Sequence, residues 1–253
     1  MTHEARPEPG AGAGAADGRD GRRSWLLAID TATTRAIVAA AALDGTPLGI
    51  TIWTAGRTHG EQLLPAIGRL HGEANLRRSR IRGVIVGTGP GAFTGLRVGI
   101  ATAKALAHEL GVAIIGVSTA EALLAAAAVV VAVGGRPGVD ARRRVLLLPA
   151  GPNDRLLVRS GDRPVLLPGG VEPDLAGDEE LVAVDLDGRA PADAVARGET
   201  ARDGLPAALL RLGAARHAAG DVDDLARLVP EYVSLPRGVR AETGEVAWSR
   251  DHR

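Results

Sequence analysis

The sequence lacks cysteine, which excludes disulfides, thiolate metal sites and cysteine nucleophiles. Its only lysine is Lys104, and 30 basic residues are balanced by 30 acidic residues. A formal net charge of zero argues against sequence-independent binding of nucleic acid over a broad surface. Aromatic residues are scarce, with three Trp, one Tyr and one Phe, so platforms that stack nucleic acid bases are not expected.

Long apolar runs are also missing. The longest, 122–133, is rich in alanine and is shorter than the roughly 20 residues that a membrane span needs. No apolar stretch follows the first charged residues, as a secretory signal would require. We therefore expect a cytoplasmic protein without membrane contact, an expectation that the absence of cysteine also fits.

Apolar runs and their periodicity predict the elements of the first half. Three strands joined by tight turns, and therefore antiparallel, are expected at 25–30, 36–43 and 47–53. A helix at 58–74, a strand at 81–89, a helix at 95–110, a strand at 111–118 and a helix at 118–128 should follow. This order indicates an α/β protein with a mixed sheet and helices on both faces.

The second half has a weaker pattern. Short strands are expected at 129–135, 142–148, 154–160, 163–168 and 181–188, and a helix at 204–219. We divide the chain into a disordered tail at 1–24, a first lobe at 25–120, a smaller second lobe at 121–240 and a frayed tail at 241–253.

A glycine-rich segment, GTGPGAFTGLRVGIATAK at 87–104, lies between a predicted strand and a predicted helix. It lacks the loop lysine of a Walker motif and matches the dinucleotide-binding fingerprint only loosely. In a third interpretation, Gly95, Gly99, Ala103 and Ala107 recur every four residues and form a smooth stripe. Such a stripe allows close packing against the sheet or another chain.

Several motifs resemble the TsaB family: DTAT at 30–33, THGEQLLPAI at 58–67 and GTGPGAFTGLRVGIATAKALA at 87–107. STAEALLAAA at 118–127 and DAR at 140–142 extend the resemblance. It implies an actin-like ATPase or ribonuclease H-like fold with an abbreviated second lobe. It also implies a non-catalytic assembly subunit of the complex that makes threonylcarbamoyladenosine on the tRNA adenosine 3′ of the anticodon.

The resemblance further implies the partners. The chain would pair with a catalytic TsaD-type paralogue, be joined by a TsaE-type ATPase, and reach tRNA through the complex. Because the smooth apolar stripe would otherwise face water, we also expect a homodimer through the same surface when the chain is alone. Pairing would use the first two helices, and a Gly99→Leu change should block it while the monomer stays folded. The expected interface residues are His59, Leu63, Leu64, Ile67, Gly95, Leu96, Gly99, Ile100 and Ala103.

Asp30, Thr31 and Thr33 occupy the place of a vestigial phosphate loop in this resemblance, with turn capping as the other interpretation of Asp30. We expect no cofactor of the chain's own, and ATP or ADP, if bound, at the complex interface. Arg142, Arg143 and Arg144 form either a solvated strand end or a contact for tRNA phosphates.

Catalytic and metal-binding residues are not expected. None of the six histidines pairs with another at i, i+4 spacing, and no serine lies in a nucleophile elbow. Two alternatives remain open: a nucleotide hydrolase or peptidase that acts alone, and a homodimeric scaffold unconnected with tRNA.

Overall fold

The computed structural model describes residues 23–54, 59–128 and 142–231, and these form two β-sheets. The larger sheet has the order β3-β2-β1-β4-β5. Its strands are β1 (Trp25–Asp30), β2 (Arg35–Ala42), β3 (Pro47–Thr54), β4 (Ile81–Gly89) and β5 (Ala113–Ser118). β1–β2 and β2–β3 pair antiparallel, whereas β4 runs parallel to both β1 and β5. The predicted mixed sheet is therefore confirmed.

The smaller sheet forms the second lobe and has the order β8-β7-β6-β9. Its strands are β6 (Arg143–Pro149), β7 (Arg155–Val158), β8 (Val165–Leu167) and β9 (Glu179–Ala183). The predicted strand at 129–135 lies outside the described residues. The second lobe thus consists of a short antiparallel ribbon, β6-β7-β8, with β9 added parallel to β6.

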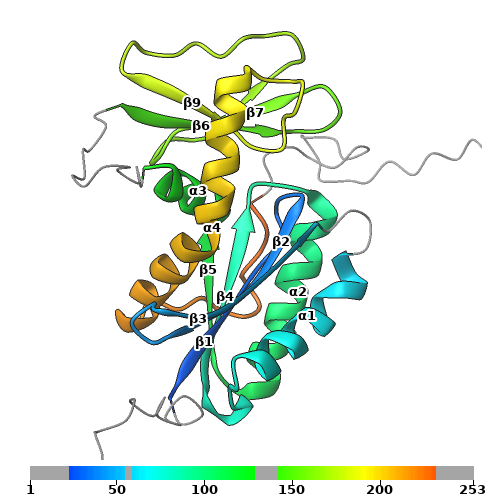
Figure 1. Ribbon diagram of the computed structural model, residues 1–253, viewed down its shortest axis with the longest axis vertical. Coiled ribbons are helices and arrows are strands. Elements are labelled where there is room, and N and C mark those ends of the chain that lie inside the picture. Colours follow the sequence, from blue (N-terminus) through cyan, green and yellow to red (C-terminus); the bar gives the residue numbers. More distant parts are fainter. Residues whose placement is uncertain (1–22, 55–58, 129–141, 232–253) are drawn as a thin grey trace, which may run out of the picture.

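Helices cover both faces of the larger sheet (Figure 1). On one face lie α1 (His59–Glu73) and α2 (Phe93–Leu110), which share one hydrophobic core with β1 and β4. On the other lie α3 (Thr119–Ala127) and part of the long helix α4 (Ala192–Ala218). A 3₁₀ turn, Arg78–Arg80, leads into β4. The expected layers of an actin-like or ribonuclease H-like fold are therefore present.

Alanine fills the strand that lies between these two helical layers. Ala39, Ala40 and Ala41 of β2 are completely buried, with alternate residues facing the two cores. Alanine is a poor strand former by propensity, but burial on both faces and pairing on both edges override that weak preference. Small side chains here also let helices pack close to the sheet.

The helix predicted at 204–219 is wrong at its start, because α4 begins at Ala192. Gly198, Gly204 and Pro206 interrupt the helical pattern of the sequence. The structure explains both glycines: a Cβ on Gly198 would lie 1.7 Å from the Ala183 carbonyl, and one on Gly204 would lie 3.0 Å from Ala126 Cβ. Close packing of α4 against β9 and α3 therefore requires residues that the sequence pattern marks as helix breakers.

The small stripe of α2 packs against the chain's own sheet, not against another chain. Gly95, Gly99, Ala103 and Ala107 are all buried. A Cβ on Gly99 would lie 2.2 Å from Thr31 Oγ1 at the end of β1. A side chain at position 99 would meet Thr31 within the protomer, so Gly99→Leu is expected to disturb the packing of α2 on the sheet, whereas the sequence predicted an effect on pairing alone.

In the part of the chain that the structure describes, none of the helices combines the length and the apolar character that crossing a membrane requires.

A pair of glycine substitutions tests the packing of α2. We expect Gly99→Ala to lower the free energy of unfolding by about 1–3 kcal/mol, because the added methyl meets Thr31. Gly68→Ala in α1 should instead raise it by about 0.5–1 kcal/mol, since nothing lies within 4 Å of its Cβ position. Urea denaturation measures both, and equal effects of the same sign would contradict this packing.

Candidate functional site

The carboxyl ends of the parallel strands β1, β4 and β5 meet at one edge of the larger sheet. In open α/β sheets this edge is where ligands usually bind. It brings together Asp30 at the end of β1, Gly87–Gly89 at the end of β4, and Ser118–Thr119 at the end of β5. These segments belong to the DTAT, glycine-rich and STAEALLAAA motifs, so the edge gathers three of the motifs found in the sequence.

Asp30 is fully buried at this edge. Its Oδ1 accepts a hydrogen bond from the Ala32 amide at 2.9 Å, and its Oδ2 accepts one from the Thr119 hydroxyl at 2.7 Å. A Cβ on Gly87 would lie 1.9 Å from Oδ2, so glycine is needed for the carboxylate to fit. Burial raises the pKa of Asp30 to about 6, although both hydrogen bonds oppose that shift.

Thr31 and Thr33 direct their hydroxyls to the chain's own backbone. Thr31 donates to the Gly95 carbonyl at 2.7 Å, and Thr33 donates to the Arg35 carbonyl at 2.9 Å. The Ala92 amide donates to the Ala32 carbonyl at 2.7 Å, so the glycine-rich loop covers the turn. The residues of the predicted phosphate loop are thus buried and internally bonded, and their nucleotide role stays a prediction.

Glu231 joins the same edge, although the sequence pattern did not indicate it. Its amide donates to the Thr88 carbonyl at 2.8 Å, and its carboxylate accepts from the hydroxyls of Thr88 and Ser118. Thr88 and Ser118 end β4 and β5, so Glu231 clamps the two strands. Its partners lie more than 110 positions away in sequence, and no local signal could have found the contact.

The predicted interface residues divide into a buried group and an open group. Six of the predicted residues, five in α2 and one in α1, are buried in the protomer's own core. This differs from the expectation that they face a partner. They are Gly95, Leu96, Gly99, Ile100, Ala103 and Leu63. They pack there because both helices use those positions to cover the sheet. His59 begins α1, and its side chain lies outside the described part.

The outer surface of α1 carries the open group. Leu64 is 59% exposed, and Ile67 is half-buried. With Leu106 and Leu110 of α2 they line an apolar groove of about 250 Å³. Gly60, Gly68 and Gly72 have no atom within 4 Å of their Cβ positions, so this side of α1 is smooth and uncovered. α1 and α2 lie side by side in Figure 1.

The arginine cluster at the start of β6 is paired with carboxylates. Arg143 bonds Asp178 at 3.0 Å and Glu179 at 3.3 Å, and Arg142 lies 3.9 Å from Glu180. Arg144 also pairs with Glu180. These pairs neutralise much of the positive charge that a tRNA phosphate contact would use, and the role in tRNA binding stays a prediction.

Metal ligands do not gather in the described ranges, where no group of three or more His, Cys, Asp or Glu side chains could hold an ion. His71 lies beside the ring of Trp25, at 6.5 Å between centroids, and His108 is exposed in the last turn of α2.

A pH series tests the state of Asp30. Its raised pKa means that the folded chain holds this proton more tightly than the unfolded chain does. Its contribution to stability is therefore present below pH 3.8 and lost as the pH rises toward about 6, by about 3 kcal/mol. We expect this decline in wild type and not in Asp30→Asn, by chemical denaturation at pH 4 and pH 7. The same change in the free energy of unfolding between pH 4 and pH 7 in both proteins would contradict a raised pKa of Asp30.

Comparison with known proteins adds to this geometry. A family model described as TsaD, tRNA N6-adenosine threonylcarbamoyltransferase, matches residues 39–150. An uncharacterized protein of Mycobacterium tuberculosis is 41% identical over 103 residues, which cover 40% of this chain and 48% of that relative. The tRNA threonylcarbamoyladenosine biosynthesis protein TsaB of Bacillus subtilis is 32% identical over 100 residues, which cover 40% of this chain and 43% of that protein.

The matched region spans less than half the length of these curated relatives. A solved structure, YeaZ from Pseudomonas aeruginosa, extends the similarity to both lobes. It aligns with a TM-score of 0.60 at 25% identity, over 83% of this chain and 100% of that one. The chain is therefore similar in sequence to TsaB proteins over about 40% of its length, and similar in fold to YeaZ over 83% of it.

Proposed function

We propose that the chain is a non-catalytic assembly subunit in the biosynthesis of tRNA threonylcarbamoyladenosine. In this proposal it pairs with a TsaD-type catalytic paralogue, which transfers the threonylcarbamoyl group to the tRNA adenosine 3′ of the anticodon. The observation that carries the proposal is the open apolar surface of α1 and α2. Names of relatives, such as that of the Bacillus subtilis protein, point to the same process.

The surface has the properties of a helix-docking site. Leu64 projects from a helix whose glycines leave its outer side smooth, so a partner helix can approach closely. The groove beside it is lined mostly by apolar side chains, and burying Leu64 alone would contribute about 1.5–3 kcal/mol. Such a patch on an exposed surface commonly marks an interaction site.

A paralogue fits this surface better than an unrelated partner does. A partner that carries the same fold would present an equivalent pair of helices, and the two pairs could pack across a pseudo-twofold axis. A second copy of this chain would offer the same helices, so a homodimer is expected when the paralogue is absent. We propose that a TsaE-type ATPase joins the pair, and that any ATP or ADP binds at the interface.

The site residues favour assembly over catalysis. Asp30, Thr31 and Thr33 are buried and bonded within the chain, so a nucleotide would have to displace these contacts to reach them. This favours the assembly role over a hydrolase that acts alone. The proposed role would place the chain in the cytoplasm, where tRNA is modified.

Pairing is tested by light scattering after size exclusion, with the chain alone and mixed with the TsaD-type protein of its organism. We expect a heterodimer for wild type and its loss for Leu64→Asp, because a carboxylate would be buried in an apolar contact. The monomer should stay folded, since Leu64 is 59% exposed.

Leu166→Asp is the matched control, because Leu166 of β8 is 45% exposed and lies in the second lobe. This variant should pair as wild type does. Separate elution of wild type and paralogue, with and without ATP, would contradict the assembly role. Equal loss of pairing in both variants would contradict the α1–α2 surface.

A further inference from the structure

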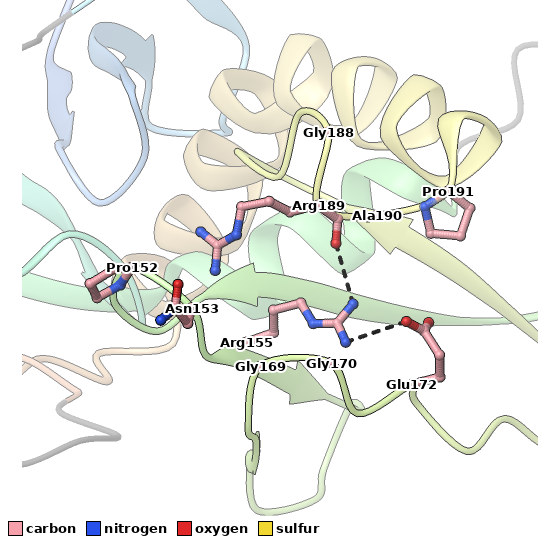
Figure 2. Close-up of a pocket in the computed structure, with 10 residues that line it drawn as sticks. All are labelled: Pro152, Asn153, Arg155, Gly169, Gly170, Glu172, Gly188, Arg189, Ala190 and Pro191. Carbon is pink, nitrogen blue, oxygen red and sulfur yellow. Dashed lines mark hydrogen bonds and ion pairs between the residues drawn. The ribbon is translucent and has the colours of Figure 1, made fainter.

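A cavity of about 840 Å³ lies in the second lobe, beside the start of α4 and apart from the surface of α1 and α2 (Figure 2). Three connections form its wall: the β6–β7 turn with Asn153, the loop after β8 with Gly169 and Gly170, and the segment between β9 and α4 with Gly188 and Arg189. Arg155 of β7 forms its floor. The volume falls in the range of small-molecule sites.

Arg155 is a buried cation with little charge compensation. It is only 5% exposed, and its guanidinium donates to the main-chain carbonyls of Arg189 and Val171. Its ion-pair partner is Glu172, at 3.6 Å, whose side chain is 75% exposed. Figure 2 shows these two side chains facing each other beside the segment that carries Gly169 and Gly170. Buried charges are usually paired more closely than this.

Arg189 adds a second positive charge. Its guanidinium donates to the carbonyls of Gly151 and Asp154, at 3.4 and 3.0 Å, and forms no ion pair with any of the described residues. The cavity wall therefore carries two guanidinium groups and one carboxylate. Main-chain carbonyls satisfy the hydrogen bonds of these cations, but they do not neutralise their charge.

The glycines leave room beside these cations. Gly170 and Gly188 have φ values of 82° and 69°, which favour glycine, and no atom lies within 4 Å of either Cβ position. A ligand can therefore approach the backbone of both loops closely.

We propose that this cavity binds a small molecule through an oxyanion, either a phosphate or a carboxylate group, held by Arg155 and Arg189. Guanidinium groups bind both kinds of oxyanion with paired, charge-assisted hydrogen bonds. The cavity exceeds the size of a free phosphate ion, so the oxyanion would belong to a larger organic molecule. Glu172 at the rim opposes the anion and weakens its binding.

Isothermal titration calorimetry of the full chain at low ionic strength tests this site. Pyrophosphate and malonate are the probes, and their relative affinities separate a phosphate site from a carboxylate site. Arg189→Gln should weaken the preferred probe about tenfold or more, as expected for the loss of a charge-assisted hydrogen bond. Glu172→Gln should tighten binding several-fold, because it removes the only carboxylate of the wall.

The control is Arg163→Gln, which removes an exposed arginine at the opposite end of β8 and should leave binding unchanged. A purely structural role of the two arginines would not produce tighter binding in Glu172→Gln. This variant keeps the test decisive if Arg189→Gln fails to fold. Failure of wild type to bind either probe, or equal weakening in Arg189→Gln and Arg163→Gln, would overturn the proposal.

Discussion

The close approach of the glycine-rich segment to the end of β1 is the constraint on which the first lobe depends. Gly87 makes room for the Asp30 carboxylate, and Gly99 makes room for the Thr31 hydroxyl. Gly91 lies against the Ala32 carbonyl, where a Cβ would come within 2.2 Å. Three glycines of one continuous motif thus allow the glycine-rich segment to pack against the turn after β1. That docking positions α2, and α2 in turn supports α1 with its open surface.

A second set of contacts joins the two lobes near that turn. The Thr34 amide donates to Asp185 at 2.7 Å, and Arg202 of α4 pairs with the same carboxylate. Arg35 bonds Asp203 at 2.8 Å. The Asp185 and Arg202 side chains are nearly buried, so this is a more costly contact to break than a solvent-exposed ion pair. The turn after β1 therefore belongs to both lobes.

Most strands and helices were predicted correctly because the residues that specify each of them are neighbours in the sequence. Strand Ile81–Gly89 and the cap at Gly111, with φ 61°, follow from an apolar run and a terminal glycine. The buried face of α2 could not be assigned in the same way. The small stripe fits either a sheet or a partner, and only the position of Thr31 decides between them.

The remaining parts of the site depend on contacts between distant segments. Glu231, Asp185 and the cavity around Arg155 combine residues from separate elements, and no spacing rule links them. The start of α4 was missed for a related reason. Its glycines serve contacts with β9 and α3 that cannot be read from the helix alone.

The path of the chain after β9 has a consequence for the order in which the protein is made. α4 returns from the second lobe to cover β2, β4 and β5, and Asp223 then pairs with Ile114 along the free edge of β5. The first lobe is thus interrupted in sequence by the second. During synthesis the edge of β5 stays unpaired, and α3 alone covers one face of the sheet, until about a hundred further residues have emerged. If synthesis stops between β5 and α4, the unfinished chain would therefore expose apolar sheet surface and an unpaired strand edge, both of which favour aggregation.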